Sequence, residues 1–283
     1  MREVYILLRL IRIQNCLMTA AGVWLGAYLT GENYSATVVY FASLVGALVC
    51  AAGNLFNDIT DIEIDRVNHP QRPLPSGDIT VSAAAIAVLL LVIVSQTISL
   101  IVSGVLAIAT AISLALLALY NIRLKKLPLV GNTTVALLGA FPLALGALLV
   151  APKSLSYIPG PIVATGFAFL IHLTREILKD LVDWRGDNLA SYKTLPSYLK
   201  PKIVILLVAI LMTLLAVLVL ISANLDWYNQ YYTYTAAILV ALPLLLLAVF
   251  IASRQDIDRH RVAASVLKLV MVAGMIAFLV GRK

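Results

Sequence analysis

The chain has 283 residues, of which 61% are hydrophobic and only 12% are charged, and its formal net charge is +7. Charged residues make up about a quarter of an average soluble domain, so this composition excludes a soluble globular fold and indicates an integral membrane protein. The positive charge calls for no nucleic acid partner, because basic residues gather on the cytoplasmic side of membrane proteins.

Apolar runs long enough to cross about 30 Å of hydrocarbon predict the membrane-spanning helices. The N-terminal stretch MREVYILLRLIRIQN is basic and amphipathic, and we interpret it as a lead-in to a retained first helix rather than as a signal peptide. Nine helices are expected, at 14–31, 36–57, 80–98, 101–121, 129–151, 158–179, 201–222, 232–253 and 262–281. We therefore predict an all-α polytopic membrane protein with one domain over residues 1–283.

The distribution of basic residues predicts the orientation. With the N-terminus in the cytoplasm, eighteen of the 21 basic residues are on the inside, and only Lys153, Arg282 and Lys283 are on the outside. This bias agrees with the positive-inside rule and with an odd number of crossings. We expect a multi-pass protein of the cell membrane with a cytoplasmic N-terminus and an external C-terminus.

The acidic residues are concentrated in two windows. Eight of the 14 acids lie there: Asp58, Asp61, Glu63 and Asp65 in the first window, and Glu176, Asp180, Asp183 and Asp187 in the second. Each window contains DxxDxxxD, and steps of three and four residues return to one face of a helix, so each aspartate triplet is expected to form a stripe. Both windows are followed by Leu-Pro-Ser, at Leu74 and Leu195, which indicates a degenerate internal repeat.

Like charges on one helix face repel each other, and a bound cation relieves that repulsion. One such window is compatible with a solvated helix end, but two windows facing the same compartment favour a metal site. Grouped carboxylates suit Mg²⁺, which shares a few carboxylates with the phosphates of a substrate. Four basic residues beside the windows suit a diphosphate, although topology alone explains any one of them: Arg72, Arg175, Lys179 and Lys193.

Four stretches together resemble the UbiA superfamily of intramembrane prenyltransferases. They are NDITDIEID at 57–65, NHPQRPLPSG at 68–77, YNIRLKK at 120–126 followed by Gly131-Asn132, and REILKDLVDWRGDNLASYKTLP at 175–196. The likeness spans most of the chain. Some members of the superfamily have YxxxK, whereas Tyr120 lies five residues before Lys125 here, which leaves Lys125 and Lys126 as alternatives for the motif lysine.

The resemblance implies a helical bundle around a central cavity that is open to the bilayer, with cytoplasmic cap loops. The residues that it implies for Mg²⁺ and diphosphate are Asn57, Asp58, Asp61, Asp65, Asp180, Asp183 and Asp187. Those implied to contact the phosphates are Arg72, Lys125, Arg175, Lys179 and Lys193. Tyr120 would face the reacting allylic carbon, and the expected catalytic set is Asp61, Asp65, Asp183, Asp187, Tyr120 and Lys125.

Two asparagines in the expected helices are candidates for the cavity lining. Asn15 lies in the first helix, and Asn54 lies one turn before Asp58. Both are expected either to bind substrate or to hydrogen-bond between helices, which is the commoner role of polar residues in lipid.

The resemblance is strongest to archaeal members that make ether lipids. It implies transfer of geranylgeranyl from its diphosphate to the hydroxyl of geranylgeranylglyceryl phosphate. An aromatic acceptor, as in quinone synthesis, is the alternative on the same fold. A secondary transporter is the remote alternative, because transporter sites tend to lie at the membrane midplane, whereas these acids lie at helix ends. Alcohol phosphatidyltransferases are disfavoured because neither window has their DxxDGxxAR pattern.

Overall fold

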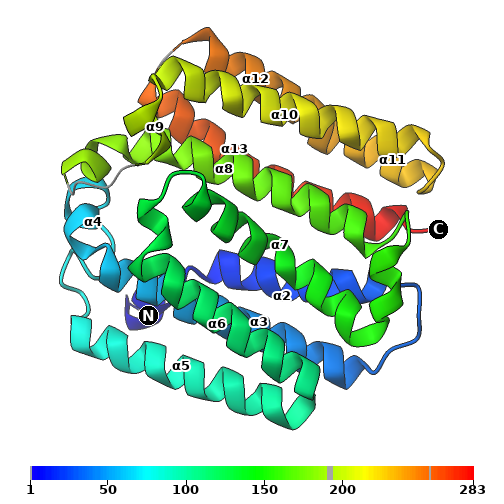
Figure 1. The fold of residues 1–283 in the computed structure, drawn as a ribbon, viewed down its shortest axis with the longest axis horizontal. Helices are drawn as coiled ribbons and strands as arrows, with labels where there is room; N and C mark the ends of the chain where they lie inside the picture. The colour runs from blue at the N-terminus through cyan, green and yellow to red at the C-terminus, as the bar shows by residue number, and fades with distance from the viewer. Residues whose placement is uncertain (1, 190–193, 255) are drawn as a thin grey trace.

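The fold is all-helical in the computed structural model, which describes residues 2–189, 194–254 and 256–283 and contains no strand within those ranges (Figure 1). The elements in chain order are α1 (Arg2–Leu10), α2 (Ile13–Leu29), α3 (Ala36–Thr60), α4 (Ile62–Asn68), α5 (Val81–Val102), α6 (Gly104–Ile122), η1 (Leu124–Lys126), α7 (Val130–Val150), η2 (Pro152–Ser156), α8 (Pro161–Leu189), α9 (Leu195–Tyr198), α10 (Pro201–Asn224), α11 (Gln230–Ala236), η3 (Ala237–Ala241), α12 (Leu242–Ser253) and α13 (Ile257–Gly281).

The described residues contain eight helical segments that are long and apolar enough to cross a membrane, or nine when the bent pair α1 and α2 counts as one span. The segment from α11 through α12 is one of them. The predicted polytopic helical fold is therefore confirmed. The main difference in boundaries is α8, which continues to Leu189, ten residues beyond the expected end at 179.

The bundle has two flanks joined by a central group of helices (Figure 1). Helices α3, α5 and α6 pack together on one flank, and α10, α12 and α13 pack together on the other. Helices α2, α7 and α8 connect the flanks, because α2 packs against α3 and α7, and α8 packs against α7 and α13. The second acidic window is carried by a central helix, and the first by the flank beside it.

Helices α2 and α7 approach each other at backbone contact. A Cβ added at Gly26 would lie 1.9 Å from the Leu143 carbonyl oxygen, and one at Gly146 would lie 1.9 Å from the Val23 carbonyl oxygen. Small residues let membrane helices approach this closely. The contact therefore requires glycine at both positions.

The first membrane segment is broken between α1 and α2. Arg12 has φ 53 and ψ 60, and the two helix axes differ by 59°. The break leaves the Ile11 carbonyl without its helical partner, and it accepts hydrogen bonds from Asn54 Nδ2 at 3.0 Å and Cys16 Sγ at 3.2 Å. The expected lead-in is thus a separate helix, and the bend holds Arg12 at the inner end of α2.

The two chain termini lie at opposite ends of the bundle. The N-terminus, α4 and α9 lie at one end in Figure 1, and the C-terminus lies at the other. At the C-terminal end, Arg282 donates to the Tyr28 carbonyl at 2.7 Å and Lys283 pairs with Asp226 at 2.6 Å. Termini at opposite ends agree with the odd number of crossings that the charge distribution predicts.

Candidate active site

A cavity of about 460 Å³ lies inside the bundle, between helices from both flanks. Its side walls are mainly apolar, and Tyr232 and Phe278 line it toward the C-terminal end of the bundle. The charged residues of its lining are Arg12, Arg72, Arg175, Glu176, Lys179 and Lys268. The cavity thus combines an apolar chamber with a strongly cationic region.

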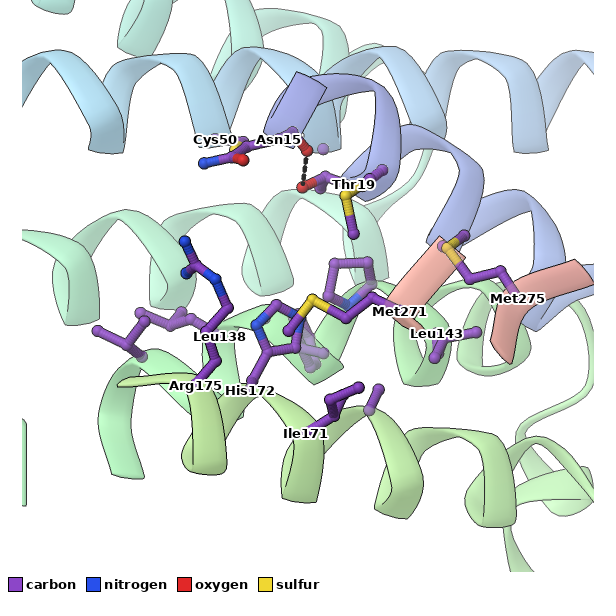
Figure 2. A pocket seen from close by; sticks show the side chains of 18 of the residues that line it. Asn15, Thr19, Cys50, Leu138, Leu143, Ile171, His172, Arg175, Met271 and Met275 are labelled. Atoms are coloured by element: carbon purple, nitrogen blue, oxygen red, sulfur yellow. Dashed lines mark hydrogen bonds between the residues drawn. The ribbon is translucent and has the colours of Figure 1, made fainter. Parts of the chain in front are cut away.

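Figure 2 shows part of this lining, including residues supplied by α2, α3, α8 and α13. Asn15, Thr19 and Cys50 face the cavity from α2 and α3, and Thr19 Oγ1 donates to the Asn15 carbonyl at 3.0 Å. His172 and Arg175 face it from α8. Met271 and Met275 on α13 belong to the same lining, and flexible thioethers adapt to ligands of irregular shape.

Seven of the residues singled out in the sequence line this cavity, namely Asn15, Asn54, Asn57, Arg72, Tyr120, Arg175 and Lys179. Asn54 also makes the interhelical hydrogen bond to the Ile11 carbonyl, so the two roles expected for it are compatible. Tyr120 lines both this cavity and a smaller one of about 30 Å³ that also contacts Lys125 and Asp180. It therefore stands between the cavity and the second acidic window.

The first acidic window is divided between two helices. α3 ends at Thr60, and Asp61 has φ −105 and ψ 10 before α4 begins. The expected single helix through Asp58, Asp61 and Asp65 is therefore wrong, because it is interrupted at Asp61. The carboxylates of Asp58 and Asp65 still meet at Arg72, whereas Asp61 pairs with Lys125.

Each aspartate of this window has a basic partner. Asp58 forms an ion pair with Arg12, Asp65 with Arg72, and Asp61 with Lys125. The Arg72 guanidinium also lies 3.6 Å from Asp58, so one cation is shared by two carboxylates. Burial raises the pKa of Asp65, although the adjacent Arg72 guanidinium acts in the opposite direction.

Lys125 is the lysine that reaches the window. Besides its ion pair with Asp61, its Nζ donates to Thr60 Oγ1 at 2.8 Å, and its side chain is only 6% exposed. It lies in the short helix η1, which joins α6 to α7 and follows Tyr120. This geometry favours Lys125 over Lys126 as the motif lysine.

The second acidic window lies in the C-terminal part of α8, which the charge distribution predicts to face the cytoplasm. Asp180 accepts a hydrogen bond from Asn132 Nδ2 at 3.1 Å. Glu176 pairs with Arg175 and with Lys179, each at 3.0 Å. The side chain of Asp187 and all of Lys193 lie outside the described part of the chain.

The two windows meet through α4 and α8. His69 Nε2 lies 3.3 Å from Asp183 Oδ1, and Asn68 Nδ2 donates to the Asp183 carbonyl at 3.2 Å. These contacts connect residues more than a hundred positions apart and bring the halves of the sequence repeat to one place. Among the described side chains, no group of three or more acids, histidines or cysteines is arranged so that it could hold a metal ion by itself.

Sequence reasoning missed several residues of this site. Glu176 was part of the second window without a role, and His69 was given none within NHPQRPLPSG, yet each pairs with a member of the candidate site. Arg12 was counted only toward the cytoplasmic charge, whereas it pairs with Asp58. The signal for Glu176 was its spacing of one helical turn from Asp180; nothing in the sequence showed that α4 would place His69 beside α8.

The sequence pattern of the UbiA prenyltransferase family matches residues 16–272. This chain belongs to that family. It is a polytopic membrane prenyltransferase, as the two acidic motifs and RPLPSG predicted from the sequence.

Individual relatives cover nearly the whole chain. A digeranylgeranylglyceryl phosphate synthase of Methanopyrus kandleri is 34% identical over 96% of this chain and 97% of its own length. One of Saccharolobus solfataricus is 32% identical over 97% of this chain and 95% of its own length.

Solved structures agree with the fold. A structure described as giving insights into digeranylgeranylglyceryl phosphate synthase in membranes has a TM-score of 0.72 and 27% identity, with 99% of each chain covered. A UbiA homologue of Archaeoglobus fulgidus, solved with GPP and Mg²⁺ bound, has a TM-score of 0.66 and covers 97% of this chain and 100% of its own. Its identity is 19%, so this second likeness concerns the fold alone.

Proposed function

We propose that this family member transfers a geranylgeranyl group from geranylgeranyl diphosphate to the free hydroxyl of geranylgeranylglyceryl phosphate, a step of archaeal ether-lipid synthesis. The observation that carries the proposal is the cavity, in which a cationic region adjoins an apolar chamber. Such a shape suits two substrates that each join phosphate groups to a long apolar chain. The full-length similarity to synthases of this name supports the same acceptor.

The residues present fit magnesium. Asp58 and Asp65 already share the positive guanidinium of Arg72, and carboxylate oxygens are hard ligands of the kind that Mg²⁺ prefers. Mg²⁺ keeps several waters and shares its coordination with substrate phosphates, so a complete protein cage is unnecessary. The residues that would hold it are Asp58, Asp61 and Asp65 in the first window and Asp180, Asp183 and Asp187 in the second.

The proposed reaction begins when the C–O bond between the allylic carbon and diphosphate breaks. When bound, Mg²⁺ stabilises the negative charge that develops on the leaving group. The residues that would add cationic contacts to the substrate phosphates are Arg72, Lys125, Arg175, Lys179 and Lys193, and Asn57 would orient the diphosphate. Tyr120 would face the allylic carbon from its position in the cavity wall.

The acceptor then completes the exchange. Its hydroxyl oxygen forms the new ether bond to the allylic carbon, and its proton and the diphosphate leave as products. The apolar wall serves this step because it keeps water from trapping the allylic cation first. Embedding the site in a membrane also suits the product, which carries two apolar chains.

The proposed orientation places the acidic windows and N-terminus in the cytoplasm and the C-terminus outside. It is supported by the distribution of 18 basic residues against three and by the termini at opposite ends of the bundle.

The test is a choice between acceptors. Purified protein is given Mg²⁺, labelled geranylgeranyl diphosphate, and either geranylgeranylglyceryl phosphate or a panel of hydroxybenzoates and naphthoates. We expect label in the lipid phosphate only and none when Mg²⁺ is chelated. Label on aromatic rings alone would refute the ether-lipid proposal, while leaving the family assignment intact.

A further inference from the structure

Lys268 is a basic residue of the cavity that the proposed chemistry has not used. It lies on α13, which packs against α2 and α8, whereas the acidic windows lie on α3, α4 and α8. It follows Ile257, the first residue of that helix, by eleven positions. At 1.5 Å per residue this is roughly 16 Å along the axis, and the half-buried side chain of Lys268 lines the cavity.

The other cations of the cavity lining have acidic partners. Arg12 pairs with Asp58, and Arg72 with Asp65. Arg175 and Lys179 share Glu176. Lys268 forms no ion pair with any carboxylate of the described side chains within 4.0 Å.

The surroundings of Lys268 are cationic. Arg175 Nε donates to the carbonyl of Ala264, one helical turn before Lys268, at 3.4 Å, so Arg175 is tied to the same face of α13. Arg12 and Lys179 line the same cavity as Lys268, as does the carboxylate of Glu176. The cavity lining as a whole has five cations and one carboxylate.

An unpaired ammonium among like charges is costly inside a membrane protein, and ionisable residues at such positions mark functional sites by default. An anion bound at this point would relieve both the repulsion and the lost solvation. We propose that Lys268, together with the neighbouring guanidinium of Arg175, forms a second anion subsite that binds the phosphate of the acceptor lipid. This inference rests on the proposed function and names the part of the acceptor that the α13 side of the cavity recognises.

The subsite adjoins the diphosphate site through Arg175 on α8, and Lys268 on α13 supplies its other side. The diphosphate is expected at the windows, where Asp61 and Asp183 lie, whereas Lys268 reaches the cavity from another helix. A phosphate monoester held there would keep the acceptor's glycerol unit beside the apolar chamber. Lysine provides a point charge and arginine a bidentate contact, so the two together suit a phosphate dianion.

The experiment compares Lys268→Gln, Lys268→Arg and the wild type in steady-state kinetics. A matched control is Lys202→Gln, because Lys202 is an exposed lysine at the start of α10 and outside the cavity lining. Each variant is given geranylgeranylglyceryl phosphate and, separately, geranylgeranylglycerol, which lacks the phosphate. KM is measured for the donor as well as for each acceptor.

We expect Lys268→Gln to raise KM for the lipid phosphate by about ten- to a hundred-fold, the loss typical of one hydrogen bond to a charged group. KM for the donor and turnover of the phosphate-free acceptor should match the wild type, which also shows that the variant is folded. Lys268→Arg should recover most of the affinity, and Lys202→Gln should behave as the wild type.

Two outcomes would contradict the subsite at Lys268 alone, and a third would contradict the proposed function as well. An unchanged KM for the lipid phosphate in Lys268→Gln, with an active wild type, overturns the subsite alone. A rise confined to the donor KM assigns Lys268 to the diphosphate and also overturns the subsite. A wild type that prenylates neither glycerol lipid refutes the proposed function, and the subsite with it.

Discussion

Replacing Gly26 by alanine should force α2 and α7 apart. The added Cβ would lie 1.9 Å from the Leu143 carbonyl oxygen, about 1.5 Å closer than the 3.4 Å at which ordinary contact begins. The obstructing atoms belong to the backbone, so no side-chain rotation relieves the clash. Overpacking of a well-packed interior costs about 1 to 3 kcal/mol, and we expect the upper end of that range here.

The assay is thermal unfolding of the purified protein in detergent, together with prenyl transfer. At about 2 to 4 °C per kcal/mol for chains near this size, Gly26→Ala should lower Tm by roughly 6 to 12 °C. Activity should fall as well, because α2 carries Asn15 in the cavity lining and a displacement of about 1 Å costs up to a hundred-fold in rate.

Gly166→Ala is the matched control. Gly166 is also a helical glycine, on α8, but a Cβ there meets nothing within 4 Å. Its replacement should leave Tm unchanged or raise it, because alanine is the better helix former by about 1 kcal/mol. Equal Tm values for Gly26→Ala and the wild type would show that the two backbones are not in contact.

Three further predictions concern the site and its orientation. Asp61→Asn should lower turnover by two or more orders of magnitude, because several kcal/mol of contact to the leaving group is lost at about 1.4 kcal/mol per tenfold, and it should also lower Tm, because Lys125, whose side chain is 6% exposed, loses its ion-pair partner; full turnover would remove Asp61 from the metal site. Asp183→Asn should also lower turnover by two or more orders of magnitude, and it should weaken the contact with His69. A lower Tm with unchanged turnover would mark Asp183 as structural only. In oriented vesicles, an impermeant thiol reagent should label Ser76→Cys only from the cytoplasmic face and Lys283→Cys only from the other; labelling from the same face would show that the helix count is wrong.

Membrane thickness made much of this fold predictable from sequence. It sets the length of a spanning helix, so apolar runs located the helices to within a few residues except at α8. The break at Asp61 was not predictable, because DITDIEID contains no glycine or proline to mark it. The second window kept its regular helix, and the same pattern of acids therefore gives two different local structures.

The identity of the cavity residues was only partly predictable. Arg72 was found because it stands beside the first acidic window in the sequence, whereas Tyr120, far from both windows, was found only through the family resemblance of YNIRLKK. Lys268 stands alone in the apolar run VLKLV and was counted only toward the cytoplasmic charge. Its importance depends on how α13 is rotated toward α8, which is a matter of packing between distant segments rather than of local pattern.

The contacts of α4 with α8, through His69 and Asn68 to Asp183, have a thermodynamic consequence. A ligand bridging the two windows has its full site only in the folded bundle, so its binding free energy adds to the free energy of unfolding. At a free concentration a hundred times Kd, this linkage is worth about 2.7 kcal/mol. Melting curves recorded with a non-reacting diphosphate would therefore report substrate affinity without any turnover, even for variants whose chemistry has been abolished.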